Sequence, residues 1–169
     1  MTDISELFVR KSRALLVSDY LPKIDRSLTP LEEEDVWWRP NPASNSIGNL
    51  MLHLAGNVTQ WIIGGVGGRP HVRMRQQEFD ERTPFPKTDL LSRLSAVVAE
   101  ADEIIGGLDE TTLAERRQIQ RYDVSVLEAV YHVVEHFGMH TGQIILISKA
   151  RSAKDLALWE PPAGETAGR

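Results

Sequence analysis

The chain has 169 residues, about the length of one domain, and its 41% hydrophobic and 25% charged residues are typical of a soluble globular protein. The formal net charge is −5 and no long run of Lys and Arg is present, so we expect no nucleic-acid partner. The lack of cysteine excludes disulfides, thiolate ligands, iron–sulfur clusters and an internal cysteine nucleophile, so any metal must be held by His, carboxylates or water.

The N-terminus has no basic start followed by an apolar stretch, which a secretory signal would need. No window approaches the roughly 18 apolar residues of a membrane span. We therefore expect a cytoplasmic protein with no membrane partner. A single domain should cover residues 1–169, with a flexible tail from about residue 160 onwards.

The first predicted helix is amphipathic. Apolar residues recur every three or four positions from Ile4 to Ser27, and Pro22 should kink or split the helix there. After it, Thr29 to Glu32 has the pattern of a capping box. This pattern predicts a short helical turn that carries Trp37 and Trp38.

The second long helix is predicted from Ser46 to Ile63, with Asn45 or Ser46 as its cap. The glycines between 64 and 68 stop it. They do not form a phosphate-binding loop, because they follow a helix and lack the Gly-Lys-Ser/Thr ending. About two dozen residues then pass before the next apolar period, which predicts a long crossover connection.

Two further helices complete the pattern. One runs from Asp89 to Ile105 and is stopped by two glycines. The other opens with a capping box at Ser125 and continues to about Ala150, apolar on nearly every side, so we expect it to be buried. No alternating strand pattern is present. The sequence therefore predicts an all-α four-helix bundle with a long crossover between the second and third helices.

Three of the five histidines, His132, His136 and His140, lie four residues apart on the last predicted helix and form one ridge. Eight residues of helix rise about 12 Å, whereas each nitrogen must lie about 2 Å from an ion, so only one adjacent pair can chelate a metal. His53 lies among apolar residues of the second helix, with Asn57 one turn away. If it is buried it needs a carboxylate, a carbonyl or a metal as partner. A lone His is more often a hydrogen-bonded core or surface residue, and the HxxxH pairing is what favours a metal.

Two other patterns on the last helix have alternative explanations. His132 to His136 matches the H-x-x-E-H zinc-protease signature. That signature requires a distant acidic ligand, and only Glu160 and Glu165 follow it, in a tail rich in Pro and Gly, so we disfavour a protease. Gly138 and Gly142 lie roughly opposite His136 and would let another backbone approach, in the bundle or in a dimer.

Three segments together resemble the DinB-like (YfiT-like) superfamily: WWRP at 37–40, NSIGNLMLHLAGN at 45–57 and HFGMHTGQ at 136–143. The resemblance covers nearly the whole chain. It implies a four-helix bundle, commonly dimeric, with one metal held by a His of the second helix and an HxxxH pair of the fourth. Those residues are His53, His136 and His140 here.

The same resemblance assigns His132 to a pocket or supporting role and suggests that Gln143 orients a ligand or a bound water. Asn57 and Trp61 are further candidates for the pocket, although packing in the core would also explain Trp61. Thr141 stands where many relatives carry Arg, so the substrate of the relatives does not transfer to this chain.

Characterised members of the superfamily are metal-dependent thiol transferases and isomerases that use thiols such as bacillithiol, mycothiol or glutathione. The resemblance implies a similar activity on a small-molecule electrophile and a homodimer as the assembly. Imidazole ligands suit zinc or nickel as the divalent metal, with iron and manganese as alternatives. Three neutral imidazoles leave the ion its full charge and an open position, which suits activation of a thiol or a water. Because the chain has no cysteine, the low-molecular-weight thiol must be external. A metal-dependent hydrolase and a non-catalytic metal-binding bundle are the alternatives.

Overall fold

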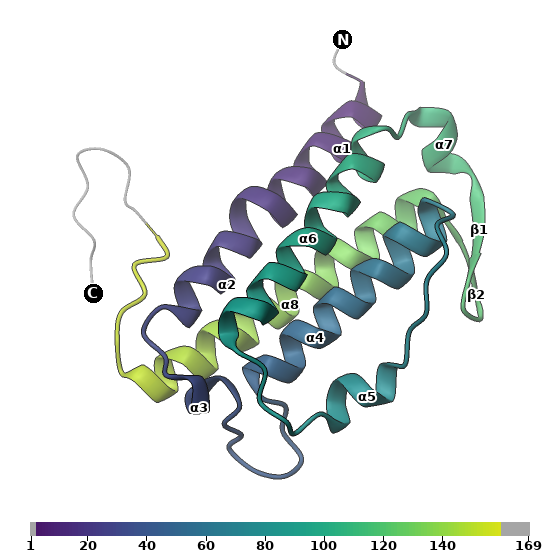
Figure 1. Ribbon diagram of the computed structural model, residues 1–169. Helices are drawn as coiled ribbons and strands as arrows, with labels where there is room; N and C mark the ends of the chain where they lie inside the picture. Colours follow the sequence, from purple (N-terminus) through teal and green to yellow (C-terminus); the bar gives the residue numbers. More distant parts are fainter. Residues whose placement is uncertain (1–2, 160–169) are drawn as a thin grey trace, which may run out of the picture.

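Four long helical rods make up the structure, and the predicted all-α four-helix bundle with a crossover is confirmed (Figure 1). The computed structural model describes residues 3–159, so the predicted flexible tail at 160–169 lies outside the described residues. Helical segments with π-type hydrogen bonding are labelled η. The rods consist of α1 (Ile4–Arg13), η1 (Ala14–Tyr20) and α2 (Leu21–Leu28); α4 (Ile47–Val58) and η2 (Thr59–Val66); α6 (Lys87–Gly106); and α8 (Val126–Ser152).

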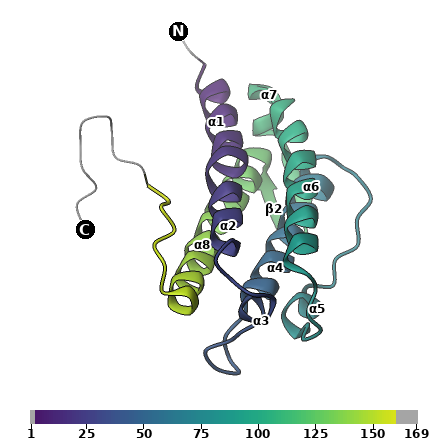
Figure 2. The same cartoon turned by 60° about the vertical axis from the view of Figure 1, so that its left-hand side comes forward.

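The directions of the rods explain the crossover. In Figures 1 and 2 the first rod and α8 run one way, whereas α4 and α6 run the other. Each rod contacts two others, in the order α1–α2, α6, α4 and α8 around the bundle. Because α4 and α6 are parallel neighbours, the chain must return along the bundle between them. Residues 67–86 make this return, and they include the short helix α5 (Arg75–Asp80), which packs against α4.

Pro22 is marked by a change of helix type and not by a break. Pro22 is the second residue of α2. This helix follows directly on η1, in which the turns are wider than in an α-helix. A proline has no N–H to donate to the preceding turn, and a local shift to π-type bonding is one way in which a helix adjusts its hydrogen bonds. The first rod therefore remains one continuous support for the bundle.

The predicted capping box at Thr29 is wrong. The short helix α3 (Glu33–Val36) begins later, and Glu32 caps it through reciprocal hydrogen bonds with Asp35. The Thr29 hydroxyl instead donates to the carbonyl of Asp25, which belongs to the preceding helix. Thr29 is itself in a helical conformation, so the chain has not yet left α2 at this point.

A β-hairpin that the sequence analysis did not predict lies between α6 and α8. The short helix α7 (Glu110–Ala114) leads into β1 (Arg116–Ile119) and β2 (Tyr122–Ser125), which pair antiparallel. The two-residue turn places Gln120 at a positive φ of 56°. Ile119 is buried over η2, where a Cβ on Gly65 would overlap its side chain. The hairpin is thereby held over the end of the second rod.

The core runs along the middle of the bundle and takes large side chains from every rod: Leu16, Ile24, Leu54, Ile62, Leu94, Ile105, Phe137 and Ile144. The prediction that α8 is buried on nearly every side is wrong. Four of its apolar side chains are between 41% and 69% exposed: Leu127, Tyr131, Met139 and Leu146. On the exposed side of α8 these apolar side chains alternate with the charged Glu128, Glu135 and Lys149.

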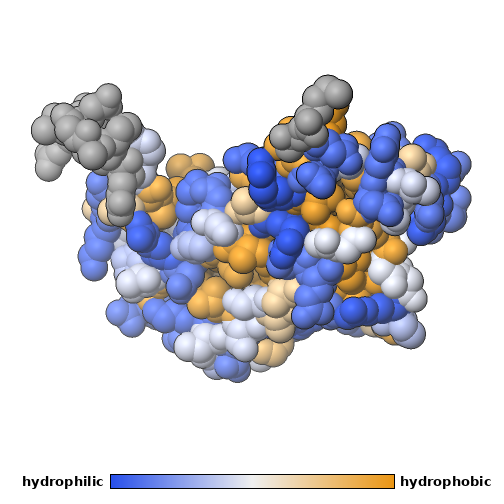
Figure 3. Space-filling view, turned by 90° about the horizontal axis from the view of Figure 1, so that it is seen from above, coloured by the Kyte–Doolittle hydropathy of each residue, from blue (hydrophilic) through white to orange (hydrophobic). Residues whose placement is uncertain are grey.

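The outer surface is mostly hydrophilic on the face seen in Figure 3, with hydrophobic residues gathered near the N-terminal end of α1. Ile4 and Leu7 of that helix are among the exposed apolar side chains. Over residues 3–159, none of the helices has both the length and the apolar character that a bilayer crossing requires.

Candidate metal centre

Three imidazole rings converge between α4 and α8. The Nε2 atoms of His53 and His140 each lie 3.1 Å from the Nε2 of His136. Candidate ligand atoms of all three residues lie within 4.8 Å of one another. His136 and His140 are one turn apart on α8, and α4 packs beside that turn and brings His53 to the same point. His53 and His140 are buried, with exposed fractions of 3% and 9%.

A carboxylate fixes the protonation of His53. Its Nδ1 lies 2.8 Å from Oε2 of Glu78, and a carboxylate can only accept a hydrogen bond, so Nδ1 carries the proton. Arg73 donates to both oxygens of Glu78, at 2.7 and 2.8 Å, and holds the carboxylate in place. In its neutral form, His53 then presents an unprotonated Nε2 to the centre of the cluster.

Gln143 does the same for His140. Its Oε1 accepts a hydrogen bond from Nδ1 of His140 at 2.7 Å, which again leaves Nε2 without a proton. The sequence analysis expected Gln143 to orient a ligand or a bound water, and in the structure its side chain orients the imidazole of His140. Two lone pairs therefore point at the Nε2 of His136.

These lone pairs need a positive charge or a proton between them. His136 Nδ1 is buried and has no hydrogen-bond partner among residues 3–159, so without a metal its proton is better placed on Nε2, between the other two rings. A cation on the three Nε2 atoms would move that proton to Nδ1. The donor set fits a divalent ion that prefers imidazole, such as zinc or nickel.

The site favours neutral rings. Burial, reinforced by the neighbouring His140 and His53, lowers the pKa of His136 to about 3. Burial also lowers the pKa of His140, against the effect of the Gln143 hydrogen bond. For Glu78, burial would raise the pKa, but the hydrogen bonds from Arg73 and His53 outweigh it and hold the pKa below its usual range. Neutral imidazoles beside an ionised carboxylate are the form that binds a metal.

The metal-free protein is expected to become less stable as the pH falls from about 7.5 to about 5. Unfolded His takes up a proton near pH 6.5, whereas folded His136, with its pKa of about 3, stays neutral. The unfolded state therefore binds more protons below that pH and is progressively favoured. Urea unfolding in the presence of a chelator, at both pH values, measures the effect.

The matched variant is His136→Gln, which removes the histidine whose pKa is lowered furthest. Its stability should depend less on pH over the same range. The lowered pKa of Glu78 does not interfere, because its contribution to stability is lost only below the unfolded pKa of about 4.5. Equal pH dependence in both proteins would show that His136 is not the responsible group.

His132 does not join the cluster. Its ring packs on Trp61 with the centroids 4.2 Å apart, and its Nε2 lies 3.4 Å from Nδ2 of Asn57. Burial lowers the pKa of His132 as well, so this ring is neutral. Glu135, the acid of the protease-like signature, is exposed. His132, Asn57 and Trp61 instead line a pocket next to the cluster.

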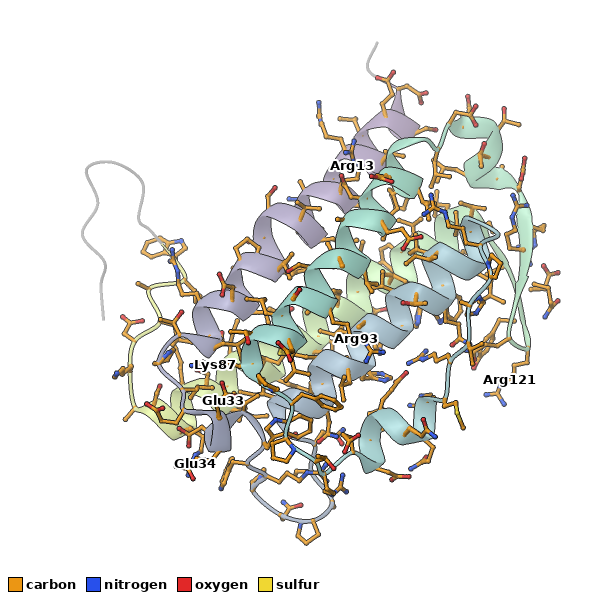
Figure 4. The ribbon with its side chains drawn as sticks, in the orientation of Figure 1. Arg13, Glu33, Glu34, Lys87, Arg93 and Arg121 are labelled. Atoms are coloured by element: carbon orange, nitrogen blue, oxygen red, sulfur yellow. The ribbon has the colours of Figure 1, made fainter. Side chains whose placement is uncertain are left out.

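That pocket has a volume of about 600 Å³. His53 and His136 form its floor, and the crossover and the hairpin supply the rest of its wall: Arg73, Arg75, Gln120, Arg121 and Tyr122. Figure 4 shows Arg121 at the tip of the hairpin. The cluster is therefore accessible from one side to a small molecule.

Several residues that support the site were not found from the sequence. Glu78 and Arg73 are on the crossover, which has no periodic pattern, and Phe79 packs on His53 with a ring separation of 4.6 Å. The sequence held one indication of this contact, because Gly56 lies in a helix whose neighbouring residues are mostly large and apolar. A Cβ on Gly56 would overlap the Glu78 carboxylate, so glycine is needed there to admit Glu78.

The fold and the cluster define a helical bundle with a three-histidine site that could hold a metal ion. Residues 3–164 match the family described as "Protein of unknown function (DUF1572)", and the chain belongs to this family. No curated protein matches the chain.

Solved structures share the fold. A conserved protein from Enterococcus faecalis is 15% identical, with a TM-score of 0.73, and the match covers 91% of this chain and 100% of the other. A DinB-like protein, YjoA, from Bacillus subtilis is 14% identical, with a TM-score of 0.63, and the match covers 86% and 94% of the two chains. At these identities the similarity establishes the fold alone.

Proposed function

We propose that the protein is a metal-dependent transferase that moves a low-molecular-weight thiol onto a small electrophile, with zinc or nickel held by His53, His136 and His140. The observation that carries the proposal is the convergence of three imidazole rings beside an accessible pocket. His53, His136 and His140 would hold a divalent ion there, and a bound ion would lower the pKa of a thiol or a water.

The residues of the chain divide the work. Glu78 and Gln143 hold the tautomers of two imidazoles, and Trp61 and Tyr122 provide flat apolar walls for a substrate. In the proposed step the thiol loses its proton, a sulfur electron pair forms the bond to carbon, and the leaving group departs with its bonding pair. Neutral His132, in the pocket wall, is the candidate acceptor for the thiol proton.

Two alternatives use the same cluster. A hydrolase would activate water in place of the thiol and would turn over without any thiol present. A non-catalytic site would be closed by a fourth protein ligand. In the part of the chain that the structure describes, the cluster has three members and a pocket beside it, which favours a catalytic site.

The test is a comparison of zinc-loaded, nickel-loaded and chelator-treated protein with 1-chloro-2,4-dinitrobenzene and with or without glutathione, bacillithiol or mycothiol. Product formation that requires both metal and thiol supports the transferase. Consumption of electrophiles or esters that needs metal but no thiol would point to the hydrolase. An absence of turnover with every thiol, together with a metal spectrum that no thiol changes, would refute the proposal.

We further propose that two copies pair through the exposed side of α8. Leu127, Tyr131, Met139 and Leu146 lie within about 120° of one another around the helix, with the charged Glu128, Glu135 and Lys149 in the same arc. A Cβ on Gly142, also in this arc, would contact none of the residues that the structure describes. Replacing Met139 and Leu146 by Glu should convert a dimer to a monomer, as measured by light scattering after gel filtration. A wild-type monomer at micromolar concentration would contradict the pairing.

A further inference from the structure

The pocket beside the three imidazoles is cationic. Three arginines line it, Arg73, Arg75 and Arg121, and no Asp or Glu among residues 3–159 is part of its wall. The whole chain carries a net charge of −5, so this local excess of positive charge is not a property of the protein surface in general. Such a pocket attracts an anion.

Arg73 is already committed. Its guanidinium donates to both oxygens of Glu78 and, through Nη1, to Gln60 at 2.8 Å. Arg75 and Arg121 differ, because neither forms an ion pair with any of residues 3–159. Their guanidinium groups are the free positive charges at the pocket.

Aromatic rings position both free arginines. The guanidinium of Arg75 lies 4.8 Å from the ring centre of Phe79, which in turn packs on His53. The guanidinium of Arg121 lies 5.2 Å from the ring centre of Tyr122 and donates to its hydroxyl at 3.1 Å. Stacking uses the flat face of a guanidinium and leaves edge N–H groups free to donate to an anion.

One more polar group in the pocket lacks a partner. The side chain of Asn57 is 4% exposed, and its Oδ1 has no hydrogen bond within the described part of the chain. A buried amide without a partner is destabilising, and a polar group of a bound molecule would satisfy it. Asn57, which also lines the pocket, thus marks a second recognition point.

We infer that the molecule bound in this pocket carries an anionic group, a carboxylate or a phosphate, that Arg75 and Arg121 bind while its reactive end faces His53, His136 and His140. The inference rests on the proposed function and names the chemical class of its substrate. Arg75 comes from the crossover and Arg121 from the hairpin, the two segments that the bare four-helix bundle does not require. The crossover and the hairpin therefore supply the residues that select the substrate, whereas the long helices supply the residues of the metal centre.

The experiment uses the full chain loaded with cobalt, whose visible spectrum reports a thiol reaching the metal. Two thiols are compared, 3-mercaptopropionate and the uncharged 3-mercaptopropionamide. For the wild type we expect the carboxylate to bind roughly tenfold more tightly, because two charge-assisted contacts at exposed arginines give a few-fold each. The preference should shrink in about 0.5 M salt.

The double variant Arg75→Gln/Arg121→Gln should reduce the preference to about twofold or less, while Arg93→Gln leaves it unchanged. Arg93 lies on α6 (Figure 4). It is the matched control because it lines a different pocket. Comparing the same two thiols across variants also cancels the difference in their own pKa values. Equal binding of both thiols by the wild type, or a preference that survives the double variant, would overturn the inference and leave the thiol function standing.

A second pair of probes separates this inference from the thiol chemistry. Benzohydroxamate and 4-carboxybenzohydroxamate bind metals without a thiol. If neither thiol changes the cobalt spectrum, the proposed function fails, and the hydroxamates decide the inference on their own. A carboxylate preference that depends on Arg75 and Arg121 supports it, and equal affinities overturn it.

Discussion

Replacing His136 by Ala is expected to reduce bound metal from about one ion per chain to less than about a tenth of that. His136 Nε2 lies between the other two nitrogens, so its loss leaves His53 and His140 without the ring that both face. Four-ligand structural zinc sites bind with roughly 10–16 kcal/mol, so one ligand contributes on the order of 3–4 kcal/mol. Its loss should weaken binding roughly 100- to 1,000-fold. Equilibrium dialysis followed by elemental analysis measures the ion.

The control for this variant is His132→Ala, one turn earlier on the same helix. His132 lies in the pocket wall and outside the cluster, so this protein should keep its metal while losing whatever the pocket contributes to turnover. Circular dichroism checks that both variants remain helical. A His136→Ala protein that still binds one ion with wild-type affinity, or a His132→Ala protein that loses it, would show that the cluster is not the metal site.

The long helices could be predicted from the sequence because each repeats its apolar residues with helical period over many turns. The starts of α4 and α8 were also predictable. Asn45 or Ser46 was expected to cap α4, and Ser46 does so, while the capping box expected at Ser125 is present at the start of α8. Thr29 failed under the same rule. Its hydroxyl finds an acceptor in the turn before it, and a local pattern does not reveal which of two possible helix ends the chain uses.

The hairpin escaped prediction for a different reason. Each strand has four residues, and Ile119 is the single apolar residue of β1, so the sequence shows no alternation of apolar and polar residues there. What fixes its place is a tertiary contact, Ile119 against Gly65 on the second rod. Arg121 reaches the pocket as a consequence of that contact, and no local pattern could have assigned it a role.

The candidate site was likewise predictable where its residues lie on periodic helices, and not where tertiary contacts place them. The geometry of a helix showed that only an adjacent pair of the three ridge histidines can share an ion, and the structure brings His136, His140 and His53 together. The choice of that pair, however, came from the family resemblance and not from spacing. Glu78 and Arg73 were missed because the crossover has no period, and only packing on α4 brings them to His53.

Replacing Glu78 by Gln is expected to weaken metal binding roughly 10- to 100-fold, as loss of a partner to a metal-ligating His typically does. An amide oxygen can still accept from His53 Nδ1, but it brings no negative charge and leaves the buried Arg73 guanidinium, 5% exposed, without its counter-charge. Competition with a chromophoric chelator near pH 7.5 gives the affinity. The matched control is Glu81→Gln, whose carboxylate accepts from the backbone N–H groups of Arg82 and Thr83 and does not contact the cluster.

Gly56→Ala tests the same contact without altering any charged or ligating group. Alanine is about 1 kcal/mol more favourable than glycine inside a helix, so the change should strengthen α4 itself. Its Cβ, however, would occupy the space of the Glu78 carboxylate and push that group away from His53. Gly107→Ala is the control, because the nearest atoms to a Cβ there are 3.6 and 3.9 Å away. Metal affinity that falls in Gly56→Ala and not in Gly107→Ala would mean that the fit of the crossover onto α4 sets the strength of the site. Unchanged affinity in both Gly56→Ala and Glu78→Gln would mean that His53 needs no support from the crossover.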